Sequence, residues 1–377
     1  MMDFIASLLV IFAASAIGRF LSKKSNQPTI LGELILGAIL GNLAFLHFSE
    51  DIDHVADIGI LLLLFSAGIA INFEEFKKIE GVSIIVASSG VVLPFILGYF
   101  VAVSFGFSNT VALFIGTSLV ATSVGVNAEV LMELGKLGTK TGTLIMGAAV
   151  VDDIIGIIML SALISLTKTG VIAIEKILLL IFSAIAFVFI SIVWGIRLGK
   201  YISKKVVIRK ENLLLAGMLF VLLFALIAEK IGLSMIIGSF IAGLIVGQTH
   251  FSKEMEEYIS LIGGGFFIPI FFVAIGMHFD ISAFFSVTLF AIVLLIVAIA
   301  GKLFGCGLGT KLCRFSNHQA LLVGTAMIPR AGVELVLIKL GIQYGLIDSE
   351  IASAILIVVI VTTLISPPLL TKILRSF

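Results

Sequence analysis

Residues 143–160 read Thr143-Leu-Ile-Met-Gly-Ala-Ala-Val-Val-Asp152-Asp153-Ile-Ile-Gly-Ile-Ile-Met-Leu160, an apolar run with two adjacent carboxylates near its centre. Apolar residues continue beyond it, and about 20 mainly apolar residues make a helix that spans a membrane. An aspartate at mid-membrane costs about 2.5–3.5 kcal/mol on insertion scales, and two neighbouring carboxylates resist joint ionisation. We therefore expect a membrane helix whose aspartate pair needs a counter-charge, a bound cation or protons.

The composition extends the membrane interpretation to the whole chain. The 377 residues are 60% hydrophobic and only 12% charged, with a mean hydropathy of +1.26. A soluble domain averages roughly half apolar and a quarter charged, so one soluble core cannot hide this much apolar surface. The net charge of +1 gives no indication of nucleic-acid binding, and Cys306 and Cys313 have neither a metal-ligand spacing nor a disulfide framework. The sequence predicts an all-α polytopic membrane protein.

Thirteen segments are long and apolar enough to be transmembrane helices. The first is a helix rather than a signal peptide, because Asp3 is acidic and the basic residues follow the apolar run. The segments are roughly 3–21, 29–48, 55–72, 81–105, 109–134, 140–167, 171–198, 211–230, 234–250, 259–278, 281–310, 317–343 and 350–374. Their connections are short, so no separate soluble domain is expected.

The distribution of basic residues predicts the orientation. Of the 24 Lys and Arg residues, all but six fall in loops on one side of a thirteen-helix topology, the exceptions being Lys168, Lys176, Lys230, Lys302, Arg330 and Lys339. Because cytoplasmic loops carry the excess of Lys and Arg, we expect a multi-pass protein of the cell (inner) membrane. Its N-terminus is predicted outside and its C-terminus in the cytoplasm.

Two pairs of segments indicate an internal repeat. Residues 31–41 resemble 237–247 at an offset of 206, and residues 112–117 resemble 320–325 at an offset of 208. The offset corresponds to seven helices, an odd number, so the copies are inverted in the membrane. Two inverted six-helix repeats joined by a linker helix are a transporter architecture. Chance similarity between glycine-rich helices is the alternative.

Lys302, in the apolar segment 281–310, could supply the counter-charge for the aspartates. It lies nine residues before Lys311, about 14 Å along a helix from the cytoplasmic end. Flanking glycines permit close helix approach, which favours a buried partner. A lysine that extends to the inner interface is the other interpretation.

Segments 109–134 and 317–343 both contain helix-breaking residues at matching repeat positions. The first has Thr122 and Ser123, and the second has Pro329 with Arg330 and Glu334 around a glycine. Broken backbone at membrane depth is tolerated where it lines a cavity or is buried in protein, so we expect two crossed discontinuous helices at the binding site. Arg330 and Glu334 could neutralise half-helix ends there, or form a purely structural ion pair.

Other polar residues are expected to be peripheral. Glu33 and Asp57 are predicted near an interface or in the wall of a funnel, and the five histidines in loops or at helix ends.

These motifs together resemble the second cation:proton antiporter family, with the closest likeness to its electrogenic sodium/proton branch. The motifs are the Thr122-Ser123 stretch, the Asp152-Asp153 pair, Gly301-Lys302, the Pro329-Arg330-x-Gly-x-Glu334 run and Ser366-Pro367-Pro368. The resemblance implies that Asp153 is the ion-binding carboxylate and proton carrier, that Asp152 pairs with Lys302, and that Thr122 and Ser123 lie at the unwound crossing. Many relatives have Ala-Gly-Leu-Glu where this chain has Ala67-Gly68-Ile69-Ala70, so a role for an acid there is in doubt.

The resemblance also implies a homodimer with two kinds of domain. The dimerisation domain would comprise residues 1–80 and 211–280, and the mobile core domain residues 81–168 and 281–377, with linker helix 7 in residues 169–210.

The predicted function is exchange of sodium or lithium ions for protons by alternating access, with no enzyme chemistry and no cofactor. Hard oxygen ligands suit Na⁺, and Asp153 and Asp152 would bind it together with helix oxygens near Thr122 and Ser123. The predicted partners are membrane lipids and a second copy of the chain, with Na⁺ and H⁺ as substrates and no nucleic acid. A potassium/proton antiporter and a gated cation channel are the alternatives. An aspartic enzyme fits poorly, because adjacent residues on a helix point about 100° apart.

Overall fold

The computed structural model describes residues 3–43, 49, 51–169, 173–205, 210–280, 282–283, 288–330, 337–338, 341–342 and 346–375, with backbone alone at 167–169 and 210–211. Every regular element in these ranges is a helix. The helices are α1 Phe4–Lys24, α2 Thr29–Gly41, α3 Asp51–Ala70, α4 Phe73–Lys78, α5 Glu80–Ser104, α6 Asn109–Ser118, α7 Val124–Glu133, α8 Lys140–Thr169, α9 Ile174–Ile190, α10 Ile196–Lys205, α11 Lys210–Lys230, α12 Met235–Val246, α13 Ser252–Ile262, α14 Ile268–Met277, α15 Leu289–Leu312, α16 Asn317–Ala326 and α18 Ser349–Arg375.

The helices confirm a multi-pass, all-helical membrane protein. Among the described residues, nine helical segments are long and apolar enough to cross a membrane, and Thr29–Gly41 and Met235–Val246 are shorter apolar helices. Two of the nine contain a π-helical turn: Ser191–Gly195 joins α9 to α10, and Gly263–Phe267 joins α13 to α14. The predicted segments 109–134 and 317–343 are absent from the nine because each is interrupted in its middle.

Several helix boundaries differ from the predicted ones. The helix predicted to begin near residue 259 begins at Ser252, because α13 is an amphipathic continuation that the hydropathy pattern excludes. Helix α15 begins at Leu289, where the Thr288 side chain accepts a hydrogen bond from the backbone N–H of Ala291. The short helix α4 was not predicted. Asn72 caps it by accepting hydrogen bonds from two backbone N–H groups.

Glycines let several pairs of helices approach to backbone contact. A Cβ on Gly37 of α2 would lie 2.2 Å from the Val273 carbonyl oxygen of α14, and one on Gly243 of α12 would lie 2.2 Å from the Phe65 carbonyl oxygen of α3. Glycines of the facing helices make equivalent contacts. A Cβ on Gly276 would lie 2.3 Å from the Leu34 carbonyl oxygen, and one on Gly68 would lie 2.3 Å from the Phe240 carbonyl oxygen. Such small-residue contacts replace the hydrophobic effect as the basis of helix association in lipid.

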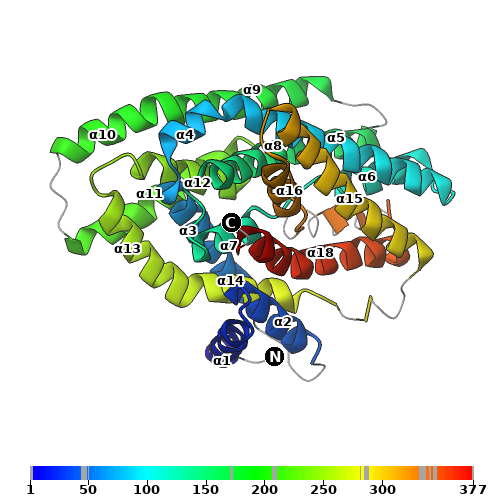
Figure 1. Cartoon of the computed structure of the whole chain (residues 1–377), viewed down its shortest axis with the longest axis horizontal. Coiled ribbons are helices and arrows are strands. Elements are labelled where there is room, and N and C mark those ends of the chain that lie inside the picture. The colour runs from blue at the N-terminus through cyan, green and yellow to red at the C-terminus, as the bar shows by residue number, and fades with distance from the viewer. Residues whose placement is uncertain are drawn as a thin grey trace.

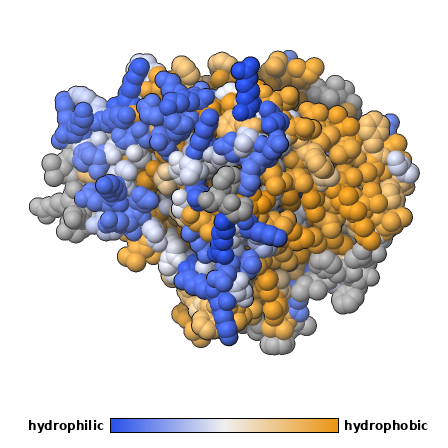
Figure 2. All heavy atoms as spheres, viewed as in Figure 1, coloured by the Kyte–Doolittle hydropathy of each residue, from blue (hydrophilic) through white to orange (hydrophobic). Residues whose placement is uncertain are grey.

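Two further close pairs are α1 with α2 and α5 with α15. A Cβ on Gly32 would lie 2.1 Å from the Gly18 carbonyl oxygen, and one on Gly301 would lie 2.8 Å from Pro94. In Figure 1, α5, α6 and α15 form one side of the molecule, while α1 and α2 lie at the edge opposite α9 and α10. The surface over α5, α6 and α15 is largely apolar in the same view, as expected for a face in contact with lipid (Figure 2).

Candidate functional site

The chain unwinds in the middle of segment 109–134, at the position that the sequence indicates. Helix α6 ends at Ser118 and α7 begins at Val124, with residues 119–123 non-helical. The Ser123 hydroxyl accepts a hydrogen bond from the backbone N–H of Val126 at 3.4 Å and so caps α7. Thr122 and Ser123 are both buried. The break therefore places the end of one half-helix and the start of another inside the protein.

A second non-helical stretch crosses the first. Helix α16 ends at Ala326, and residues 327–330 are not helical. The Ser123 backbone N–H donates to the Pro329 carbonyl at 2.7 Å, and the Thr122 hydroxyl donates to the Met327 carbonyl at 3.1 Å. These bonds satisfy backbone groups that both breaks leave without helical partners. Residues 331–336, including Glu334, lie outside the described part of the chain.

Arg330 lies at this crossing. Its side chain is 0% exposed, and its Nη1 donates to the Ala121 carbonyl at 2.9 Å. Its own carbonyl accepts a hydrogen bond from the Thr363 hydroxyl of α18. Since α6 and α16 both point their C-terminal, partially negative ends at the crossing, a guanidinium has a favourable position there.

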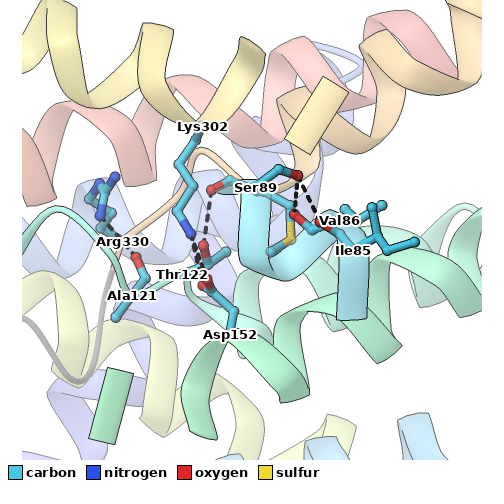
Figure 3. A network of polar contacts seen from close by, with 9 residues as sticks. Ile85, Val86, Ser89, Ala121, Thr122, Asp152, Lys302 and Arg330 are labelled. Atoms are coloured by element: carbon cyan, nitrogen blue, oxygen red, sulfur yellow. Dashed lines mark hydrogen bonds and ion pairs between the residues drawn. The ribbon is translucent and has the colours of Figure 1, made fainter. Parts of the chain in front are cut away.

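Lys302 and Asp152 form a buried ion pair beside the crossing (Figure 3). Both residues are 0% exposed. Lys302 Nζ on α15 donates to Asp152 Oδ1 at 2.8 Å and to Oδ2 at 2.9 Å. The Thr122 side chain lies next to the same carboxylate. A buried ion pair is weak evidence for stability, because the cost of removing both charges from water offsets their attraction, so its presence favours a functional reason.

Asp153 is the next residue of α8 and is 3% exposed. The described part of the site therefore contains two buried carboxylates and two buried cations, Lys302 and Arg330. Among the described residues, no three acidic, histidine or cysteine side chains converge on one point. A cation at the pair would take its other ligands from hydroxyl or carbonyl oxygens, which both helix breaks supply.

Sequence reasoning missed the partners of two acids. Glu33, predicted near an interface or in the wall of a funnel, is 1% exposed and accepts hydrogen bonds from Arg19 at 2.6 Å and from Ser15 at 2.7 Å. Glu133, at the end of α7, accepts from the backbone N–H and hydroxyl of Thr29 at 2.8 and 2.9 Å. These pairs join segments that are distant in the sequence, so the spacing of residues within one segment does not predict them.

Asn127 was also without an assigned role. It is 0% exposed, and neither its Oδ1 nor its Nδ2 has a hydrogen-bond partner among the described residues. It lies one turn beyond Ser123 on α7. An amide four residues after Ser123, in the half-helix that follows the break, was the signal that could have identified it.

Comparisons with known proteins cover nearly the whole chain, and all of them find sodium/hydrogen exchangers or antiporters. A family model described as "Sodium/hydrogen exchanger, transmembrane" matches residues 9–375. The chain is 34% identical to the "Na(+)/H(+) antiporter" of Enterococcus hirae, over 98% of this chain and 97% of that protein. It is 32% identical to the "Na(+)/H(+)-K(+) antiporter GerN" of Bacillus cereus, over 98% and 95% respectively.

A solved structure has the same fold. The sodium proton antiporter MjNhaP1 from Methanocaldococcus jannaschii, determined at pH 8, matches with a TM-score of 0.71. The match covers 98% of this chain and all of that one, at 18% sequence identity.

Proposed function

This chain belongs to the sodium/hydrogen exchanger family, and we propose that it exchanges Na⁺ for H⁺ across the cell membrane at the Asp152–Asp153 pair. The observation that carries the proposal is the buried Lys302–Asp152 ion pair beside the crossing of two unwound stretches. Asp153 is the primary cation ligand and proton carrier, and Asp152 shares the cation when Lys302 releases it. Thr122 and Ser123 hold the crossing together, and Arg330, with Glu334 outside the described residues, balances charge.

Competition for the same carboxylates couples the two ions. With no cation bound, Lys302 neutralises Asp152 and a proton neutralises Asp153. A sodium ion replaces both by binding to the carboxylate oxygens, which suit a hard cation. A carboxylate that carries a proton or a lysine is not free for Na⁺, so loading one ion expels the other.

Alternating access follows if one part of the protein moves against the rest. We assign residues 1–80 and 211–280 to a dimerisation domain, residues 81–168 and 281–377 to a core domain, and residues 169–210 to the linker helix. The glycine contacts support this division, because the backbone contacts of α2 with α14 and of α3 with α12 fall within the first group and those of α5 with α15 within the second. Across the boundary, Gly125 of α7 meets side-chain atoms of Ile60 and Phe271, which can slide more easily.

Hydrogen bonds between Thr29 and Glu133 cross this boundary, as does one from Arg375 Nη1 to the Asn26 carbonyl. Thr29 begins α2 in the proposed dimerisation domain, and Glu133 ends α7 in the proposed core. The N-cap residue of α2, Pro28, provides no side-chain cap, so Glu133 supplies the negative charge that a helix N-terminus favours. Movement of the core would break this contact, so it stabilises one of the two positions of the core.

An inverted repeat, thirteen spans and a homodimer belong to the same proposal. The glycine contacts support the repeat: Gly37 meets Val273 in the same way that Gly243 meets Phe65, at 2.2 Å in both cases. The offset is 206 residues between the two glycines and 208 between the two contact residues. These are the offsets of the sequence repeat. An outside N-terminus and a cytoplasmic C-terminus follow from the basic loops.

Flux in proteoliposomes tests the proposal. Purified protein should move Na⁺ and Li⁺ against an imposed pH gradient, and Asp153→Asn should abolish exchange while leaving the protein folded, because the amide keeps the shape and loses the charge and the titratable proton. Exchange by Asp153→Asn at near the normal rate would remove Asp153 as the carrier. Potassium is the second candidate cation, because one relative is described as a Na⁺/H⁺-K⁺ antiporter, and K⁺ should be tested in parallel.

A further inference from the structure

A cavity of about 840 Å³ lies between the end of α18 and the start of α2. Its walls come from the α1–α2 turn, the first two turns of α2 and the last turns of α18. The volume is within the range of small-ligand pockets, roughly 300–1,000 Å³. The residues of the aspartate site do not line it, so it is a separate feature.

The cavity is apolar at one end and cationic at the other. Leu31, Ile35 and Leu369 line the apolar part, and Ile35 and Leu369 remain 42% and 41% exposed. Lys372 and Arg375 line the other part, and the twelve lining residues include no acid. The cavity therefore favours an anionic group with an apolar tail.

Two buried polar atoms in the cavity wall have no hydrogen-bond partner among the described residues. They are Gln27 Oε1 and Thr371 Oγ1, and Thr371 is only 3% exposed. Buried polar atoms in folded proteins are nearly always hydrogen-bonded to protein, water or ligand. The Thr371 hydroxyl is a free donor on the cationic helix end, one residue from Lys372.

We propose that this cavity binds an anionic phospholipid. Its phosphate contacts Lys372 and Arg375, and an acyl chain lies along Leu31, Ile35 and Leu369. Basic side chains near the cytoplasmic surface attract anionic lipids, and the apolar wall favours hydrocarbon over water. In Figure 2 hydrophilic residues run from the middle of the view towards α1, beside apolar surface. Arg375 Nη1 also donates to the Asn26 carbonyl at 2.9 Å. This hydrogen bond links the α18 wall of the cavity to the α1–α2 turn, next to the proposed position of the phosphate.

A lipid at this site would contact both of the domains that are proposed to move during ion exchange, and this statement rests on the proposed function. Helix α2 belongs to the proposed dimerisation domain and α18 to the proposed core, so one lipid would contact both. Lipid binding itself does not depend on exchange and is measured without it.

Lipid-dependent thermal stability of the purified full chain tests the site. Delipidated protein in neutral detergent receives phosphatidylglycerol or phosphatidylcholine with identical chains, and native mass spectrometry counts the bound lipid. Phosphatidylglycerol should raise the unfolding temperature more and bind more tightly. Lys372→Gln with Arg375→Gln should remove this preference, by roughly fivefold in affinity for each cation. The control, Lys253→Gln with Arg314→Gln, makes the same charge change at exposed positions elsewhere and should keep it.

A second variant separates the apolar contact from charge. Leu369→Trp fills the apolar end of the cavity, keeps both cations and should reduce binding of phosphatidylglycerol. Soluble glycerol 3-phosphate should not reproduce the stabilisation. Equal loss in the control pair, full binding by Leu369→Trp, or equal stabilisation by glycerol 3-phosphate would each overturn the lipid site. Normal lipid binding by a wild-type protein that does not exchange Na⁺ for H⁺ would leave the site standing and count against the proposed function alone.

Discussion

Replacement of Lys302 by alanine should strongly destabilise the protein, because it leaves the Asp152 carboxylate buried and alone. Both residues are 0% exposed, and Lys302 Nζ contacts both carboxylate oxygens, at 2.8 and 2.9 Å. In soluble proteins, removing one partner of a buried ion pair costs about 3–5 kcal/mol. We expect a loss of this order in the free energy of unfolding of Lys302→Ala.

The same reasoning predicts that a second substitution rescues part of the loss. Asp152→Ala in the Lys302→Ala background removes the stranded charge, so the double variant should be more stable than the sum of the single losses implies. Coupled neighbours show interaction energies of about 0.5–3 kcal/mol. The assay is unfolding in mixed micelles with a denaturing detergent, followed by the loss of helical circular dichroism.

A matched control comes from the same helix. Lys311 is exposed in the last turn of α15, so Lys311→Ala should change stability by no more than about 0.5 kcal/mol. Additive losses in the double variant, or a loss in Lys302→Ala no larger than in Lys311→Ala, would show that the ion pair does not hold the resting protein together.

Three further results are expected. Exchange should be electrogenic, because Lys302 would release its proton when Na⁺ takes Asp152 and regain it when Na⁺ leaves, so that Lys302 and Asp153 carry two protons for each Na⁺; a rate indifferent to membrane potential in valinomycin-clamped vesicles would rule this out. Glu133→Ala should cost about 0.5–2 kcal/mol by removing the cap of α2, and a double-mutant cycle with Thr29→Ala should be non-additive; additive losses would exclude the contact. The hydrogen bond that His278 Nε2 donates to Asp53 Oδ1 raises the pKa of His278, so the pair contributes stability below the ordinary histidine pKa of about 6.5 and loses it as pH rises through the raised value. Asp53→Asn should remove that pH dependence of thermal stability, and an unchanged pH profile would contradict it.

The features that sequence could predict are those with a local cause. Apolar runs of membrane length gave the long helices, since length and hydropathy are properties of each segment alone. The unwinding at Thr122–Ser123 and at Pro329 was also predictable, because hydroxyl residues and proline weaken a helix and here they fall at matching repeat positions, whereas Pro94, Pro367 and Pro368 lie inside continuous helices. The glycines beside Lys302 indicated a close helix contact, and Gly301 packs against Pro94.

The features that sequence could not predict depend on which distant segments meet. The sequence around Glu33 does not name its partner, because only the fold of α1 brings Arg19 to within 2.6 Å of it. Glu133 caps a helix that begins 104 residues earlier, and neither residue has a capping motif nearby. A buried amide such as Asn127 is likewise recognised only when its surroundings are known. These contacts are tertiary, so the hydrophobic periodicity and the residue spacing of a single segment do not predict them.

The lysine explains how the site tolerates an empty state. Without an internal cation, loss of Na⁺ would leave two adjacent carboxylates in a region from which water is largely excluded, and desolvation would penalise every charged form. Lys302 Nζ lies 2.8 Å from Asp152 Oδ1. Under the proposed function it would be reprotonated when Na⁺ departs and neutralise one carboxylate, and Asp153 would take the second proton. The lysine would then compete with the transported cation for Asp152. The core would move either with sodium bound or with Lys302 charged and Asp153 protonated, and a bare carboxylate pair would not be carried.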